Sequence, residues 1–224
     1  LPAREPAIIG DSIWVSGAIP GRLFEGVYQS LFSAEDSEAE LHITGALYEF
    51  RRSDGQFIRQ IDLDYSPWLP VPAGPYLWFT AADRTPTLNT GYNPLNQSRL
   101  VALNPETGEV VETWNPCPHM LPPFYAGELL YAACIGTPDY PGDLLVIDPE
   151  TLIEVHRYSD LGRGAWPLVH LGDWVWAVYR DSGNVALLRP ETGELEHLYG
   201  LGQAPTPPVY DSQRYVWIAN TVDA

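Results

Sequence analysis

The chain contains no lysine, and all 12 of its basic residues are arginines. The absence of lysine excludes Schiff-base catalysis, P-loop phosphate binding and Ser-Lys dyads, because each of them needs a lysine side chain. Basic residues are also outnumbered, since 29 acidic residues give a formal net charge of −17. Nucleic acids and anionic membranes are bound through cationic surfaces, so we expect neither as a partner.

Methionine, cysteine and long apolar runs are scarce as well. Met120 is the only methionine, so Leu1 is not an initiator, and we expect the chain to be processed or part of a longer polypeptide. No run of 18 apolar residues occurs, which predicts no transmembrane helix. A disulfide between the two cysteines, Cys117 and Cys134, would imply an oxidising compartment, and a pair of buried thiols is the alternative.

Catalytic and metal-binding patterns are missing too. The five histidines show none of the spacings that are typical of zinc sites. Ile8–Ile13 looks like the first sequence block of GDSL-type esterases, but no histidine follows an aspartate by three positions, as the base of those enzymes requires. Cys117, His119 and Met120 could each bind a metal such as copper, but they lie within four consecutive residues of a Pro-rich segment. We therefore interpret this segment as a loop and not as a copper site. We predict no catalytic residue, no metal and no cofactor.

What the sequence contains instead is an internal repeat. Four glycines, at positions 10, 74, 127 and 172, each precede by four positions an aromatic residue in a short apolar run. The aromatic residues are Trp14, Trp78, Tyr131 and Trp176, and a fifth run surrounds Trp217. Because a repeat of fixed period determines architecture, this pattern comes before every other signal in the chain.

Each repeat continues with a tight turn between two alternating apolar runs. The turns are Ser53–Gly55, Pro105–Gly108, Pro149–Leu152 and Pro190–Gly193. Proline presets the start of such a turn and glycine supplies the positive φ near its end, so each turn predicts a β-hairpin. The turns end at 55, 108, 152 and 193, which gives spacings of 53, 44 and 41 residues.

This period, with about four short strands in each unit, predicts an all-β fold, a β-propeller with about 4.5 four-stranded blades visible. We expect a single domain over residues 1–224, with blades at 7–65, 70–117, 122–159 and 165–202 and a partial blade at 205–224. The ring is predicted to be incomplete, because there are five first halves of the repeat and four second halves. Either the polypeptide continues or another chain closes the open blade, whose edge would otherwise pair with other strands.

Two insertions lengthen the first two repeats. One contains a predicted short helix at residues 33–41, and the other spans residues 83–98. Both join the second and third strands of a blade, and elaborated loops on one face of a repeat array often bind ligands. The residues expected to gather on that face are Trp68, Tyr92, His119, Tyr140, Arg180 and Asp181. Packing between blades is the alternative for Trp68, as it is for Trp166.

Ser98–Trp114 resembles the repeat of the YVTN-type and quinoprotein-like (PQQ-repeat) propellers, which reads aromatic-Val and then apolar-Asp-x-x-Thr-Gly-x-Val. Asn220 matches the asparagine that ends the aromatic strand of YVTN repeats. The resemblance covers nearly the whole chain and implies the propeller fold and an extracytoplasmic setting. Its members include quinone-dependent dehydrogenases, lactonases and non-catalytic scaffolds, so it implies no single reaction. Gly74–Thr80 is also similar to a strand of streptogramin lyases, without their histidine pair.

The sequence therefore predicts a secreted, periplasmic or cell-surface protein that acts as a non-catalytic binding or assembly module. Its partner is expected to be a protein, or another copy of the chain, that closes the open last blade. The alternative is a metal-dependent lyase or lactonase-type enzyme with its site in the central channel. Carboxylates or histidines that converge on a cation in that channel would favour the enzyme.

Overall fold

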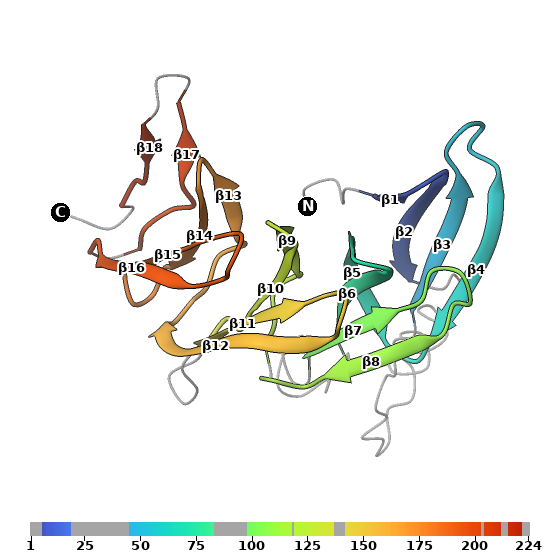
Figure 1. The fold of residues 1–224 in the computed structure, drawn as a ribbon, viewed down its shortest axis with the longest axis horizontal. Helices are drawn as coiled ribbons and strands as arrows, with labels where there is room; N and C mark the ends of the chain where they lie inside the picture. The colour runs from blue at the N-terminus through green and yellow to red at the C-terminus, as the bar shows by residue number, and fades with distance from the viewer. Residues whose placement is uncertain are drawn as a thin grey trace, which may run out of the picture. The chain divides into compact units, whose positions relative to one another are not determined.

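The protein consists of short antiparallel strands. The structure, a computed structural model, describes residues 6–18, 45–82, 98–117, 119–136, 142–202, 204–211 and 215–220. These residues form 18 strands and no helix (Figure 1). Within the same ranges, no helix has the length and apolar character needed to cross a membrane.

Four sheets have four strands each, in the order of the chain. The first contains β1 (Ala7–Ile9), β2 (Ser12–Ala18), β3 (Gly45–Arg51) and β4 (Phe57–Leu63). The second contains β5 (Ser66–Ala73), β6 (Tyr76–Ala82), β7 (Ser98–Leu103) and β8 (Val110–Trp114). The third contains β9 (Phe124–Ala126), β10 (Leu129–Ala133), β11 (Gly142–Asp148) and β12 (Ile153–Gly162). The fourth contains β13 (Val169–Leu171), β14 (Trp174–Tyr179), β15 (Asn184–Leu188) and β16 (Leu195–Gly200).

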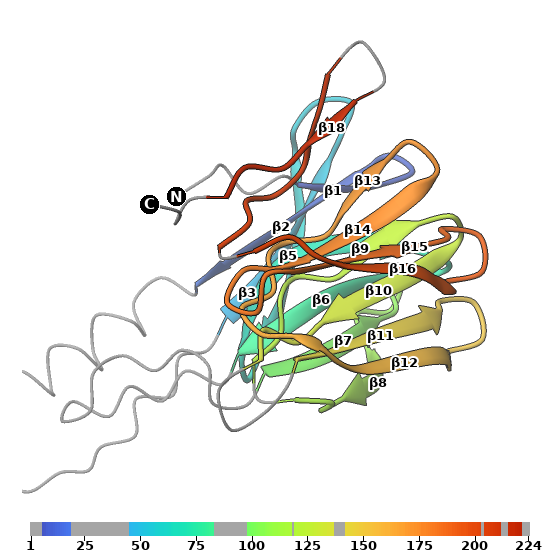
Figure 2. The same ribbon diagram turned by 90° about the vertical axis from the view of Figure 1, so that its left-hand side faces the viewer.

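A fifth sheet has two strands in the described part of the chain, β17 (Val209–Tyr210) and β18 (Val216–Trp217). Figure 2 shows this pair of strands at the C-terminal end of the ribbon. It corresponds to the first two strands of each preceding sheet, because Trp217 is the aromatic residue of the fifth repeat. The four-stranded sheets and the two strands of the fifth confirm the predicted all-β fold with about 4.5 blades visible.

The chain divides into two compact units, which are described separately. The first unit comprises Leu1–Pro72 and Leu77–Pro118, and the second comprises Ala73–Tyr76 and His119–Ala224. The first unit contains the core of Trp14, Leu47, Phe79 and Val101, all fully or almost fully buried. A fully buried Leu or Phe side chain contributes about 2 kcal/mol, so such a core is the main source of stability.

The second unit has two apolar clusters. The larger one joins the third and fourth sheets through side chains that include Tyr131, Val146, Val175 and Leu188. The smaller one lies on the other side of the fourth sheet, where Val178, Val185 and Leu187 pack with three half-buried tryptophans and with Ile218. The tryptophans are Trp166, Trp174 and Trp176. The packing of Trp166 here agrees with the structural alternative that the sequence left open for it.

The glycine of the first half of the repeat belongs to a two-residue hairpin turn. Gly127 and Glu128 have φ values of 57° and 69° between β9 and β10. Two consecutive positive φ values are those of a type I′ turn, whose twist matches that of the flanking strands. Glycine adopts this conformation without steric cost, which explains its recurrence at this position of the repeat.

The turns of the second half share one geometry. In the turn at 104–109, Gly108 N donates to Asn104 O at 2.8 Å and Asn104 N donates to Glu109 O at 2.9 Å. The turns that begin at Arg51, Asp148 and Arg189 make the equivalent first bond, and a β-bulge follows each of them. Leu152 occupies the glycine position of the third turn with φ of 61°. A leucine there adopts the positive φ that glycine adopts in the other turns.

Both insertions follow the second strand of their sheet, as predicted. β2 ends at Ala18 and β3 begins at Gly45, while β6 ends at Ala82 and β7 begins at Ser98. The predicted helix at 33–41 lies outside the described residues.

Candidate binding surface

Arg180 and Asp181, two of the residues predicted to bind a ligand, occupy the exposed turn after β14. Their backbone N–H groups donate to the carbonyls of Gly164 and Arg163, each at 3.0 Å. A run of backbone hydrogen bonds continues from Gly164 N to Ile135 O and from Ile135 N to His119 O, at 2.6 and 2.8 Å. The structure therefore links His119 to Arg180 within the second unit through main-chain contacts.

The structure does not test the other predicted binding residues as members of one site. Trp68 is half-buried within β5, in the first unit. Tyr92 and Tyr140 lie outside the described residues. The loop site thus stays a prediction, and its described members include no aromatic side chain in the second unit.

Cys117 and Cys134 are bonded to each other, because both are disulfide-bonded and the chain has no other cysteine. This confirms the disulfide that the sequence left as one of two possibilities. Among the residues that the structure describes, no group of three or more His, Cys, Asp or Glu side chains is placed to hold a metal ion.

A more regular feature is a row of three side chains that crosses the second, third and fourth strands of each four-stranded sheet. Residues that face each other on adjacent strands share one face of the sheet. The rows are Trp14–Glu49–Arg59, Trp78–Ala102–Glu112, Tyr131–Val146–His156 and Trp176–Leu187–His197. The repeat aromatic residue begins each row, and the fourth strand ends it.

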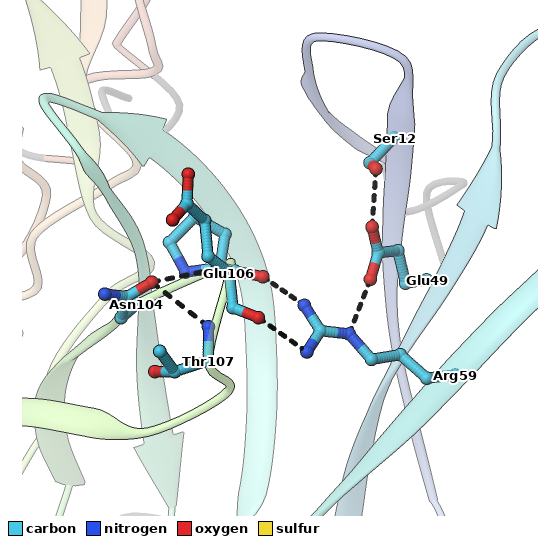
Figure 3. A network of polar contacts seen from close by, with 7 residues as sticks. Ser12, Glu49, Arg59, Asn104, Glu106 and Thr107 are labelled. Carbon is cyan, nitrogen blue, oxygen red and sulfur yellow. Dashed lines mark hydrogen bonds and ion pairs between the residues drawn. The ribbon is translucent and has the colours of Figure 1, made fainter.

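In the first unit, Arg59 joins the first sheet to the turn of the second (Figure 3). Its guanidinium donates from one terminal nitrogen to Glu106 O at 2.9 Å and from the other to Pro105 O. Asn104 holds the same turn by accepting from the N–H groups of Glu106 and Thr107, at 2.8 and 3.3 Å. We call the bonding of a fourth-strand side chain to the turn carbonyls of the next sheet the turn contact.

The negative charge of Glu49 stabilises the position of the Arg59 guanidinium in the turn contact. Arg59 Nε donates to Glu49 Oε2 at 2.7 Å, and Ser12 Oγ donates to the other oxygen of that carboxylate (Figure 3). Glu49 is only 8% exposed, so its charge needs these partners. The Arg59 guanidinium carbon also lies 5.5 Å from the centre of a Trp14 ring, at the distance of a cation–π contact.

In the second unit, histidine and tyrosine make the turn contact. His156 Nε2 donates to Thr192 O at 3.0 Å, and the Tyr158 hydroxyl donates to Gly193 O at 3.2 Å. The same hydroxyl accepts from Leu195 N at 3.0 Å, so Tyr158 fixes both sides of the turn end. The rings of His156 and Tyr158 stack with centres 5.8 Å apart.

Tyr131 adds a third bond to the same turn from the centre of the sheet. Its hydroxyl donates to Arg189 O at 3.1 Å, with Pro190 O at 3.3 Å. Burial raises the pKa of the Tyr131 phenol well above its usual value, with smaller contributions from Glu191 and Tyr158. The hydroxyl therefore stays protonated and keeps its donor role at all ordinary pH values.

The fourth sheet carries the same pair of side chains, and no turn among the described residues is hydrogen-bonded to them. His197 and Tyr199 occupy the positions of β16 that His156 and Tyr158 occupy in β12. Both are exposed, Tyr199 by 47%, and no side-chain hydrogen bond of either occurs with the described residues. Their rings stack with centres 5.5 Å apart, and Trp174 lies 5.5 Å from His197. We call the face formed by Trp174, Trp176, His197 and Tyr199 the open face.

The two-stranded sheet begins to cover this side of the fourth sheet. Ile218, directly after β18, packs with Val178, Val185 and Leu187. Three large apolar side chains in or beside the two-stranded sheet are exposed, with Val209, Tyr215 and Trp217 at 66%, 62% and 64%. Trp217 Nε1 donates to Asp211 Oδ2 at 2.9 Å, which fixes the indole at the surface.

The sequence analysis did not identify the His-x-Tyr pairs, because it examined the histidines for the spacings of zinc sites and of a catalytic base. A usable signal was present. His156 and His197 each follow the proline of their turn by seven positions, at Pro149 and Pro190, and a tyrosine follows each histidine by two. An identical offset in two repeats indicates a shared position in the blade.

No protein-family model matches the chain, and no curated protein sequence matches it. Solved structures do share its fold. Over 89% of the chain it is similar to a quinohemoprotein alcohol dehydrogenase from Pseudomonas putida HK5, with a TM-score of 0.54 and 11% identity, covering 34% of that protein.

Two further structures give comparable values. The Dos1 propeller has a TM-score of 0.53 and 12% identity over 89% of the chain and 48% of its own length. Saccharomyces cerevisiae Sqt1 has a TM-score of 0.51 and 11% identity over 91% of the chain and 55% of its own length. The chain thus spans about half or less of these proteins. At such low identity the similarity establishes the fold alone: the chain has a β-propeller fold, with four four-stranded blades and two strands of a fifth in its described part.

Proposed function

We propose that the protein is a non-catalytic binding or assembly module, and that a protein partner completes its two-stranded sheet. The observation that carries this proposal is the sheet of β17 and β18, which exposes Val209, Tyr215 and Trp217 by more than 60% each. Each of the four-stranded sheets has a hairpin of third and fourth strands beside its aromatic strand. An edge with exposed aromatic residues and free backbone groups favours the addition of a strand.

The free edge of β18 is defined by its backbone directions. Tyr215 O accepts from Asp211 N at 3.0 Å, so the polar backbone groups of Tyr215 point toward the β17 side. Backbone groups alternate in direction along a strand, and those of Val216 therefore point to the opposite edge. The N–H and C=O of Val216 are the groups that a third strand would bind.

An extracytoplasmic location and the YVTN-type or quinoprotein-like group are part of this proposal. The Cys117–Cys134 disulfide supports the location, because disulfides persist mainly in oxidising compartments. The turn sequence of Ser98–Trp114 supports the group. The enzyme alternative has no specific observation in its favour among the described residues, and we do not propose it.

Titration with a hairpin peptide tests the proposal. The probe is a fluorescent copy of Ser98–Trp114, the third and fourth strands of the second sheet, closed by a cysteine added at each end. We expect the 224-residue protein to bind it in an anisotropy titration, and Val216→Pro to weaken binding at least tenfold by deleting the edge N–H. Val216→Thr, which keeps the N–H and the β-branched shape, should bind as the unchanged protein does. Failure of the peptide to bind, or equal binding by Val216→Pro, would overturn the proposal.

A further inference from the structure

We infer that the open face is a recognition site for a tight turn of the Pro-x-Thr-Gly kind, and that His197 and Tyr199 bind its carbonyl oxygens. The inference rests on the proposed function and specifies its partner: a separate protein that offers a β-hairpin ending in such a turn. The turn would lie on the open face while the hairpin strands extend the sheet of β17 and β18.

The third sheet shows how such a turn is bound. There the row Tyr131–Val146–His156, with Tyr158 two residues further on, receives the turn of residues 190–193. The fourth sheet repeats this arrangement in register with Trp176–Leu187–His197 and Tyr199. An aromatic residue, an aliphatic residue, a histidine and a tyrosine thus occupy equivalent places on both faces.

The donors of the open face are already arranged for binding. The His197 and Tyr199 rings are inclined by 27°, and the His156 and Tyr158 rings by 25°, at similar separations. The pair on β16 therefore has its geometry in the absence of a bound turn. Binding groups that are fixed beforehand lose little side-chain entropy when the ligand arrives, which favours affinity.

The shape of the open face determines which turns fit. Where the turn of residues 190–193 meets the third sheet, a Cβ built on Gly193 would lie 2.6 Å from Val146 Cγ1 and 3.3 Å from His156 Cδ2. Gly193 also has φ of 73°, a conformation that favours glycine. Leu187 and His197 stand in the places of Val146 and His156, so the arriving turn should need glycine at its last position.

A separate protein is the occupant that the structure favours over a second copy. The Pro-x-Thr hairpins of the chain are β7–β8, β11–β12 and β15–β16, and each is built into its own four-stranded sheet. A second copy could offer one of them only by dismantling that sheet. The buried apolar side chains of β7, β11 and β15 make such an exchange costly.

The test uses the closed Ser98–Trp114 peptide against the whole 224-residue protein. We expect the double variant His197→Ala/Tyr199→Phe to bind at least tenfold more weakly than the unchanged protein. The matched control, His170→Ala/Tyr125→Phe, changes an exposed histidine of β13 and an exposed tyrosine of β9 and should bind normally. A peptide with Gly108→Val should lose affinity for the unchanged protein and show no further loss with the double variant.

The outcomes separate this inference from the proposed function. If Val216→Pro weakens peptide binding while the double variant and the Gly108→Val peptide bind normally, sheet completion stands and turn recognition is overturned. If light scattering shows a dimer that the double variant dissociates, a second copy is the occupant and the separate partner is overturned. Circular dichroism spectra equal to that of the unchanged protein show that each variant is folded.

Discussion

The pairs His156–Tyr158 and His197–Tyr199 occupy equivalent positions in two sheets, and only the first pair is hydrogen-bonded to a turn of the described residues. They have the same spacing from their turns, the same register and nearly the same ring separation, 5.8 and 5.5 Å. The first pair is half-buried and hydrogen-bonded to a turn, whereas the second is exposed. Because the geometry is the same with and without the turn, each sheet sets the position of its own donors.

In the first unit, a charged side chain makes the turn contact. Arg59 stands at the β4 position equivalent to His156 and donates to two turn carbonyls. Glu49 takes the place that the aliphatic Val146 has in the third sheet, while Trp14 keeps the aromatic place of the row. The common feature is a donor on the fourth strand, since carbonyl oxygens that lose their exposure to water need one.

The largest difference in unfolding free energy is expected between a glycine substitution in the turn at 190–193, which packs against the third sheet, and one in the turn at 53–55. We expect Gly193→Val to destabilise the protein by about 4 kcal/mol, because positive φ is strained for valine and its Cβ would approach Val146 Cγ1 to 2.6 Å. Gly55→Val has the same kind of strain, with φ of 73°, but meets nothing within 4 Å. It should cost about 2 kcal/mol. Urea unfolding measures both, and equal losses would contradict the covered state of the 190–193 turn.

Removal of the charged donor should have the next largest effect. Arg59→Met leaves the Glu49 carboxylate, 8% exposed, with its bond from Ser12 Oγ but without the guanidinium, and it removes both donors to the turn. We expect a loss of about 3 kcal/mol in unfolding free energy, since an uncompensated buried charge is costly. Arg51→Met is the control, because Arg51 pairs with Asp54 at 3.1 Å on an exposed turn. That variant should change stability by about 0.5 kcal/mol or less.

A single hydroxyl gives the sharpest test of the two tyrosines. Tyr158→Phe deletes the donor to Gly193 O and the acceptor of Leu195 N, so we expect a loss of about 1.5 kcal/mol. Tyr199→Phe removes the equivalent hydroxyl from an exposed ring and should leave the urea midpoint unchanged. A similar loss in both variants would show that Tyr199 is already bonded, and the distinction between the two faces would fail.

The architecture was accessible from the sequence because turns depend on few residues. Glycine at a positive-φ position and proline at the start of a turn are local requirements, and they recur at Gly127 and Pro190. The apolar run around Trp176, which the repeat placed in a blade, forms β14 (Trp174–Tyr179). Leu152 shows the limit of this reasoning, since packing and register impose positive φ on a residue that does not favour it.

The site was less accessible, because it depends on which turn faces which strand. His156 and His197 have the same local pattern, and only the structure shows that one is bonded to Thr192 O while the other is exposed. The distinction arises from contacts between residues more than thirty positions apart, which spacing within a repeat does not encode. Long-range packing therefore decided what local pattern left open.

The smallest expected effect concerns the first residues of two turns, Asp148 and Asn104, whose side chains differ by an oxygen in place of a nitrogen. The Asp148 carboxylate accepts from Thr151 Oγ1 at 2.8 Å and from Glu150 N at 2.9 Å, and these bonds lower the pKa of Asp148 below its usual value. Because the pKa is lower in the folded state than in the unfolded state, the stabilisation is complete above the ordinary aspartate range. It is lost as the pH falls through that range and then through the folded pKa.

Asn104 accepts equivalent backbone bonds in its turn and does not titrate, so exchange of the two residues isolates the charge. We expect Asp148→Asn to shrink the fall in the urea midpoint between pH 7 and pH 3, and Asn104→Asp to enlarge it. Both changes should be small, because both side chains lie on exposed turns where water competes for the same hydrogen bonds. If neither variant alters the pH dependence, the Asp148 carboxylate is not held by its turn, and the common geometry of these turns owes nothing to charge at their first position.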